Sequence, residues 1–329
     1  MDRLIAPNTV TAAQADTAPA TGTPGYATDG NPASNIPATR WPAYQYNAIQ
    51  EELMAIIAGG GLTPDRTDNA QILAAIRALI QASSPVVGQS RNLAMSVAAA
   101  SATQTVTAEE VVVGTSLGGL KYTLNNFSQT INLATTGAGG MDVGSAPTSG
   151  FVGIYAIYNP TSGASALLAT NATAAKVPEV YGGTGMPAGY TASALVSVWP
   201  TNSSGQFVVG CQVDRYVNIP NAIAVNTTGP VSSYTLVGAS SIIPKNAKSI
   251  SGELNIASTN ATGVSVSIAP VNASVGAQQL ACSTNSSSSN ANCPFNDIPV
   301  VTPQSFYWQV SVASGTLSQA YVVIGAYRF

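Results

Sequence analysis

Apolar residues along this chain recur first with the period of a helix and then with the period of strands. From Pro42 onward they return every three or four positions in two runs, which Gly59-Gly60-Gly61 separates. Thr67 or Asp68 can cap the second run, and Ser83-Ser84-Pro85 ends it. The pattern predicts two short amphipathic helices. Their apolar stripes consist of Ile49, Leu53, Ile56, Ile72, Ile76 and Leu79.

Two helices of this length need a partner, because most helical stability in water comes from burying an apolar face. The stripes could pack on each other as a hairpin within one chain, or copies of the chain could associate around a symmetry axis. Isoleucine-rich seams favour more than two strands, and the first ninety residues offer no other core. We therefore predict that residues 41–90 form a stem in which copies associate.

Residues 1–40 follow neither period. They are rich in Thr, Ala, Pro, Gly and Asn, as in Thr21-Gly22-Thr23-Pro24-Gly25-Tyr26. Such a segment cannot bury a face of its own, so we expect an extended strap that lies on a partner or stays mobile. Trp41 and the two tyrosines that follow it either anchor this junction or begin a helix core.

Beyond residue 90 apolar and polar residues alternate, which is typical of strands with one solvated face. The clearest case is a predicted hairpin of residues 250–256 and 264–268, joined by a turn over 259–263. Residues 306–312 and 320–326 alternate in the same way. Further strands are expected at 109–113, 120–124, 130–134, 150–158, 192–199 and 206–213.

A proline within a polar run at Ile219-Pro220-Asn221 predicts a boundary between two β domains, 91–220 and 221–329. The predicted fold is therefore mainly β: an extended strap, two short helices that form a stem, and two antiparallel, β-sandwich-like domains.

Charge is sparse, with eleven basic and fourteen acidic residues, a net charge of −3 and no histidine. The absence of histidine rules out a Ser-His-Asp or Cys-His arrangement and imidazole ligands for a metal. Neither sign of charge is clustered, which disfavours nucleic acid and anionic membranes as partners. Asp142, Glu179 and Asp214 are too scattered to indicate a carboxylate pair, and Gly137-Ala138-Gly139-Gly140 lacks the lysine of a phosphate loop. We expect a protein that is not an enzyme and needs no cofactor or metal.

The three cysteines have different surroundings. Cys211 lies in an apolar run and is expected to be a small buried hydrophobe. Cys282 and Cys293 flank a polar stretch. The two alternatives for them are a disulfide that closes this loop and two free thiols. The N-terminus shows no export signal, and no stretch approaches the ~20 apolar residues of a spanning helix, so we expect synthesis in a cytoplasm.

Loops rich in Ser, Thr, Asn and Tyr have the chemistry of adaptable binding loops. The two clearest are Tyr181-Gly182-Gly183-Thr184-Gly185 and residues 283–292. For each of them, ordinary solvated loop composition is the alternative. The candidate binding residues are Tyr181, Asn285, Asn290 and Tyr307.

Several short motifs resemble tail-fibre and receptor-binding proteins of tailed bacteriophages. The N-terminal ones are Pro24-Gly25-Tyr26, Asp29-Gly30-Asn31-Pro32, Asn47-Ala48-Ile49-Gln50-Glu51-Glu52-Leu53 and Leu62-Thr63-Pro64-Asp65. Those of the middle region are Gly139-Gly140-Met141-Asp142, Tyr158-Asn159-Pro160 and Pro187-Ala188-Gly189-Tyr190-Thr191-Ala192-Ser193. The likeness covers roughly residues 20–218, and residues 221–329 carry no such motif.

The resemblance implies a homotrimeric fibre in the virion, at the tail tip or baseplate. Its N-terminal strap would dock on baseplate or tail-tip proteins, and its helices would form the trimer stem. Its distal β domains would bind a host receptor, with the C-terminal domain 221–329 as the candidate for the receptor-binding part and Tyr181, Asn285, Asn290 and Tyr307 as the candidate residues. A surface glycan, a pilus or an outer-membrane protein of the host would suit the binding loops. Two alternatives are a polysaccharide-degrading tailspike enzyme, which usually needs β-helical repeats that are not visible here, and a bacterial surface adhesin, which should carry an export signal.

Overall fold

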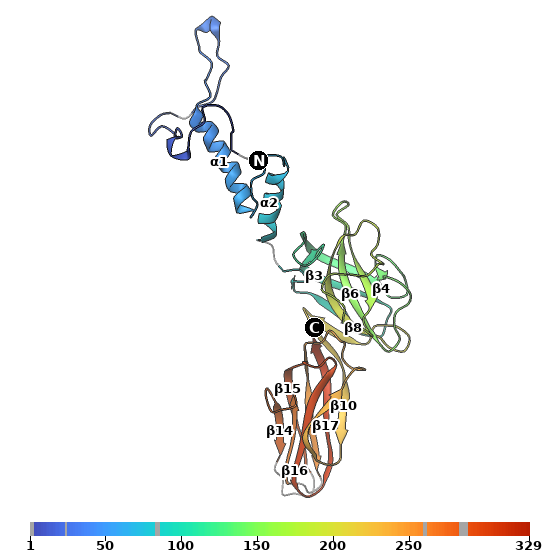
Figure 1. Cartoon of the computed structure of the whole chain (residues 1–329). Helices are drawn as coiled ribbons and strands as arrows, with labels where there is room; N and C mark the ends of the chain where they lie inside the picture. Colours follow the sequence, from blue (N-terminus) through green and yellow to red (C-terminus); the bar gives the residue numbers. More distant parts are fainter. Residues whose placement is uncertain (1–2, 24, 83–85, 259–261, 283–288) are drawn as a thin grey trace. The chain divides into compact units, whose positions relative to one another are not determined.

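The chain divides into two compact units, Met1–Ser84 and Pro85–Phe329 (Figure 1). The computed structural model describes residues 3–23, 25–82, 86–258, 262–282 and 289–329. The first unit holds the helices and the second holds the strands. The fold is therefore mainly β with two α-helices among the described residues, as the change of period predicts.

The helical unit is organised around a hairpin of α1 (Ala43–Gly59) and α2 (Gln71–Ala82). Two short 3-10 turns, η1 (Ala12–Gln14) and η2 (Pro32–Ser34), precede it. Met54, Ile57 and Ala75 form its buried contacts. At Gly60, which ends α1, a Cβ would lie 2.6 Å from the Cα of Ala75, so a glycine is required for the helices to approach this closely.

The connection between the helices is held by buried and polar side chains. The amide nitrogen of Gln71 donates to the Thr63 carbonyl, and its amide oxygen accepts from the backbone N–H of Asp65, both at 2.8 Å. The Asp68 carboxylate accepts from the backbone N–H of Ala70 at 2.7 Å. Asp68 thus holds the turn before α2, which begins at Gln71, slightly later than the predicted cap implies.

The predicted apolar stripes lie beside the hairpin contact rather than within it. Ile49, Ile76 and Leu79 are 47%, 41% and 42% exposed. Leu53, Ile56 and Ile72 are partly buried. The contact on α2 uses Ala75 and Gln71 instead, and the ~100° rotation per helical residue turns Ile72 and Ile76 away from it. The intrachain hairpin is therefore present, and half of the predicted stripe stays exposed on its surface.

The first forty residues, as far as they are described, contain no buried side chain. Arg3 pairs with Glu51 of α1 at 2.7 Å, and the backbone N–H of Leu4 donates to the Gln50 side chain. Farther on, a bridge between Asn31 and Ile36 closes a loop. The strap is thus tied to α1 by polar contacts at its start and has no core of its own.

Within the described residues, the β unit contains two sheets. One has thirteen strands, with a main path β15-β12-β17-β10-β9-β2-β3-β8-β6-β7-β5, and β1 and β4 both pair with β3; the other has the order β11-β16-β13-β14. The strands are β1 (Ser90–Arg91), β2 (Ala94–Val97), β3 (Thr103–Gly114), β4 (Lys121–Asn132), β5 (Gly140–Met141), β6 (Phe151–Tyr158), β7 (Ser165–Asn171), β8 (Ala192–Pro200), β9 (Gly210–Val213), β10 (Tyr216–Thr227), β11 (Val231–Gly238), β12 (Ser249–Ser258), β13 (Thr262–Ala269), β14 (Gln278–Cys282), β15 (Ser289–Pro299), β16 (Ser305–Ser314) and β17 (Leu317–Arg328).

The predicted strands are mostly present, but their bounds differ. The two strands predicted at 120–124 and 130–134 are parts of one long strand, β4, which spans Lys121–Asn132 and pairs along its length with β3. The predicted strand at 206–213 shortens to β9. The described strands that were not predicted are β1, β2, β5, β7, β10, β11, β14 and β15. Cys211 of β9 is exposed, contrary to expectation, because the alternation of this strand turns Gln212 inward, where its amide donates to the Val196 carbonyl.

The predicted hairpin of residues 250–256 and 264–268 is wrong. β12 pairs with β15 and β17, whereas β13 pairs with β14 and β16 in the other sheet. The two strands are consecutive in the chain, but their apolar sides, including Leu254 and Val266, belong to one core between the sheets. Alternation reveals which side of each strand is apolar, but it cannot distinguish pairing within a sheet from packing across two sheets.

The predicted boundary at residue 220 falls inside β10, which runs from Tyr216 to Thr227. Pro220 lies where the pairing of β10 with β17 shifts register between Asn218 and Ala222, and a bulge is one of the few strand positions that tolerate proline. Residues 85–329 therefore form one unit with a continuous core.

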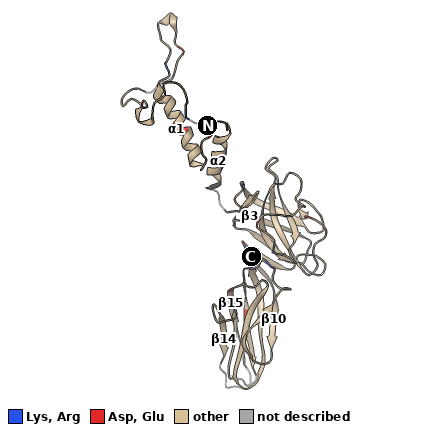
Figure 2. Cartoon of the chain, viewed as in Figure 1, with Lys and Arg blue, Asp and Glu red and all other residues tan. Residues whose placement is uncertain are grey.

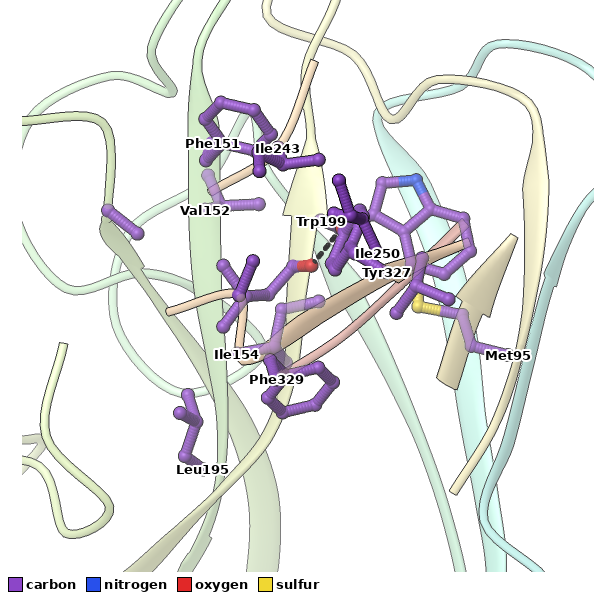
Figure 3. Close-up of a cluster of buried hydrophobic side chains, with 14 of the residues drawn as sticks. Met95, Phe151, Val152, Ile154, Leu195, Trp199, Ile243, Ile250, Tyr327 and Phe329 are labelled. Carbon is purple, nitrogen blue, oxygen red and sulfur yellow. Dashed lines mark hydrogen bonds between the residues drawn. The ribbon is translucent and has the colours of Figure 1, made fainter. Parts of the chain in front are cut away.

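The last strand inserts its end into the core of the preceding region (Figure 3). Tyr327 is fully buried, and its hydroxyl donates to the Val198 carbonyl of β8 at 2.5 Å. Trp199 is also fully buried, and its indole N–H donates to the Val208 carbonyl at 2.9 Å. Phe329 belongs to the same cluster. Residues more than a hundred positions apart thus share one core.

Gly252 lies at a bulge where β12 shifts register against both of its neighbours. A Cβ here would overlap the Val323 carbonyl oxygen of β17, which is backbone and cannot rotate away. We expect Gly252→Ala to lower the free energy of unfolding by about 1–3 kcal/mol, measured by urea denaturation. Gly238→Ala, where nothing lies within 4 Å of the new Cβ, is the control and should change little. Equal effects of the two substitutions would contradict this account.

Candidate functional site

Tyr181, a candidate receptor-binding residue, is part of a polar cluster in the β unit. Its hydroxyl donates to the Asp142 carboxylate at 2.8 Å and accepts from the backbone N–H of Gly185 at 3.1 Å. Its ring meets that of Tyr155 edge to face, with centroids 5.4 Å apart. Burial and the hydrogen bond to Asp142 raise the pKa of Tyr181 to about 12. These contacts anchor the loop 181–185, and a role in receptor binding stays a prediction.

The scattered carboxylates each have a partner of their own. Asp142 accepts from Tyr181, Asp214 accepts from the backbone N–H of Leu93 at 3.2 Å, and Glu179 pairs with Arg215. General acid and base catalysis of glycoside cleavage needs two carboxylates held at a defined separation. Each of these three carboxylates holds a loop or a strand through its own contact.

The Glu179–Arg215 pair lies against Phe329, the last residue of the sequence. Arg215 holds Glu179 with two N–H groups, and its guanidinium lies 5.2 Å from the centre of the Phe329 ring. Burial acts to raise the pKa of Glu179, but the hydrogen bonds and charge of Arg215, together with Lys248 and Lys176, outweigh it. The pKa therefore lies below its ordinary value.

This pair predicts a loss of stability in acid. Because the folded-state pKa of Glu179 is lowered, the pair stabilises the fold above the unfolded-state pKa of about 4.3 and loses that effect as the pH falls through the folded-state value. We expect Glu179→Gln to cost about 1 kcal/mol at pH 7, a modest value because the Glu179 side chain is 34% exposed, and less below about pH 4. Urea denaturation of both proteins between pH 3 and 7 measures the difference. A difference in the free energy of unfolding that does not change with pH would contradict this role of the Glu179 carboxylate.

The candidates in the C-terminal region do not come together. Tyr307 points outward from β16 of the four-stranded sheet, beside the buried Phe306 and Trp308. Asn290 is exposed on β15 of the thirteen-stranded sheet. The two sheets pack on each other through their inner sides, so these residues lie on opposite faces. Asn285 lies outside the described residues.

Asn290 belongs to a groove on the outer face of β15, β12 and β17. The groove has a volume of about 330 Å³ and is lined by Asn255, Ile256, Ala257, Asn290, Ala291, Asn292, Gln319 and Tyr321. In the strand register, Asn255 is paired with Asn292 on one side and Tyr321 on the other, and Ala257 with Asn290 and Gln319. We call the groove that these eight residues line the amide groove. Its volume lies within the ~300–1,000 Å³ of small-ligand sites.

Asn255 is the central residue of the amide groove. The nitrogen of its side-chain amide is buried and has no hydrogen-bond partner among the described residues. The alternation of residues 250–256 turns Asn255 to the solvated side of its strand, and Asn292 is the last residue of the predicted binding loop 283–292. Neither was selected as a single candidate residue, and nothing in the local pattern pointed to Gln319 or Tyr321. Only the pairing of β12 with two strands that come much later in the chain brings these residues together.

A second hollow lies within the helical unit. The strap and the start of α1 enclose about 700 Å³, and the aromatic residues of its lining are Tyr26, Trp41 and Tyr44. Tyr26 is fully exposed and Trp41 is 64% exposed. Large exposed aromatic side chains of this kind are enriched where proteins bind one another.

Cys282 and Cys293 are free thiols in this structure. Cys282 is paired with Val264 of β13, and Cys293 with Leu254 of β12. The loop 283–288, which joins their strands, lies outside the described residues. The thiol of Cys293 contacts the Pro294 carbonyl at 3.5 Å.

Charged side chains are few over both units (Figure 2). Within the described residues, no three Asp, Glu or Cys side chains gather closely enough to hold a metal ion. No helix in this part of the chain has both the length and the apolar character to cross a membrane. In the comparisons with known proteins, neither a protein-family model nor a curated protein matches the chain.

Proposed function

We propose that this chain is a structural and adhesive component of a bacteriophage virion, a homotrimeric tail fibre. Its N-terminal segment attaches to baseplate or tail-tip proteins, and its C-terminal β region binds a receptor on the host-cell surface. The protein acts by binding and not by catalysis. It is made in the bacterial cytoplasm and functions in the virion.

The exposed apolar stripe of α2 is the observation that carries this proposal. Leu73, Ile76 and Ile80 are 52%, 41% and 59% exposed within one chain. A helix of a soluble protein normally turns its apolar stripe toward a core, and contiguous exposed apolar residues mark surfaces that associate. Three helical hairpins around a common axis would bury these residues, as the isoleucine-rich seam favours.

Features of the strap, residues 1–40, favour its attachment to another protein. Its described residues contain no buried side chain, yet Tyr26 and Trp41 present aromatic surface. An extended segment without a core gains order when it lies on a partner. The proposed partners are proteins of the baseplate or tail tip.

The β unit has the features expected of a rigid receptor-binding body. Its core is continuous over both sheets, whereas the outer face carries polar, uncharged side chains such as Asn255, Asn290 and Gln319. Three copies of such a body bind a repetitive surface much more tightly than one copy does.

Two measurements test the function. Antibodies against the purified chain should label the tail tip of virions of the phage that encodes it, in electron micrographs. The purified chain should also block adsorption of that phage to host cells without releasing sugars from host polysaccharide. Labelling of another part of the virion would contradict the proposal, as would failure to block adsorption. Release of sugars would favour the tailspike alternative instead.

A further inference from the structure

We propose that the amide groove on β15, β12 and β17 is the receptor site and that its ligand is an uncharged sugar of a host glycan. The identification of the ligand as a host receptor rests on the proposed function. The chemistry of the ligand rests on the groove itself.

The lining of the groove determines the class of ligand. Four of its eight residues, Asn255, Asn290, Asn292 and Gln319, carry side-chain amides, and none is charged. An amide both donates and accepts hydrogen bonds, as does a sugar hydroxyl, so neighbouring amides can bind vicinal hydroxyls. Tyr321 adds an aromatic ring with a polar end. A phosphate, sulfate or carboxylate ligand would instead call for Arg or Lys.

Asn255 gives the strongest indication that something binds. Its amide nitrogen is buried without an acceptor, although buried donors in folded proteins nearly always have one. Asparagine is also disfavoured inside strands, and β12 lies between two neighbours. The terminal torsion of an asparagine side chain is soft, so a small rotation aims the donor into the groove. A ligand hydroxyl there would supply the missing acceptor.

The arrangement favours a ligand on the face of the sheet over a peptide strand added to its edge. β15 is the edge strand, but Gln278 of β14 already occupies part of that edge. Its amide nitrogen donates to the Asn296 carbonyl at 2.6 Å, and its amide oxygen accepts from the Asn296 N–H at 3.0 Å. Addition of a strand needs these backbone groups to be available. A sugar on the face needs only the side chains.

The test compares groove variants of the full chain on an array of neutral and anionic oligosaccharides. We expect binding to neutral oligosaccharides, weakened about tenfold or more by Asn255→Ala and by Asn292→Ala, because each removes hydrogen bonds to the ligand. Asn292 is exposed, so its substitution leaves the fold intact even if Asn255→Ala disturbs it. Asn125→Ala, an exposed asparagine on β4, is the matched control and should leave binding unchanged.

The inference would be overturned if no neutral oligosaccharide binds, whether or not anionic ones do, or if Asn292→Ala binds as well as the unchanged chain. If adsorption to host cells survives periodate oxidation of their glycans but not protease treatment, the receptor is a protein, and the inference also fails. In each of these cases a chain that still blocks phage adsorption leaves the proposed function standing. Groove-dependent sugar binding without any block of adsorption would refute the proposed function, and with it the identification of the ligand as a host receptor, but the assignment of a sugar to the groove would stand.

Discussion

Ile76→Asp should convert a trimer of the full chain into monomers and weaken its binding to host cells at least ~100-fold. Ile76 is 41% exposed on α2 and lies in the stripe that the proposed trimer axis buries. In the trimer the introduced carboxylate would be removed from water and would find no partner for its charge, which is strongly unfavourable. In the monomer the same side chain is solvated, so the helical hairpin should keep its fold. Only the affinity that comes from joining three sites would be lost.

Light scattering measures this effect directly. The unchanged chain should have three times the monomer mass of 33.2 kDa, and the variant should have the monomer mass. Ala74→Asp is the matched control, because Ala74 is exposed on the side of α2 opposite Ile76 and should leave the trimer intact. A monomeric unchanged chain would refute the trimeric stem. A variant that stays trimeric would show that the β unit, and not the helical stem, determines assembly.

Tyr327→Ala should lower the free energy of unfolding of the β unit by about 3–5 kcal/mol, the range for loss of a buried aromatic side chain. Tyr327 is fully buried, and its hydroxyl donates to the Val198 carbonyl of β8. Tyr327→Phe keeps the ring and removes the hydroxyl, so it should cost about 1–3 kcal/mol. The difference between the two variants separates packing from the hydrogen bond.

Calorimetry of these variants also tests the domain boundary. Because residues 85–329 share one core, Tyr327→Ala should shift a single transition that includes residues 90–220 as well as the C-terminal region. Hydrogen exchange would show protection falling in β8 and in β17 together. Two transitions, of which only one shifts, would instead support independent domains on either side of residue 220.

Local patterns predicted the candidate site only in part. Asn290 was selected for its polar loop composition and lies in the amide groove. Tyr181 was selected in the same way, but it holds Asp142 and the backbone of Gly185. Composition indicates that a side chain is able to bind something. It cannot indicate that a neighbour within the same fold already uses that capacity.

The sequence by itself determined the elements that depend on neighbours along the chain. Periods of 3.6 and 2 located both helices and about half of the described strands, because these periods follow from backbone geometry. The absence of histidine likewise ruled out any site that needs an imidazole, without reference to a fold.

Only the tertiary structure decided which strands pair and which side chains meet. β12 and β13 are adjacent in sequence but lie in different sheets, whereas β12 pairs with β15 and β17. The end of β17 enters a core built by β6 and β8, and the amide groove forms from three strands separated by long connections. These arrangements depend on which apolar faces best exclude water together. That is a property of the whole packed chain and of no single segment.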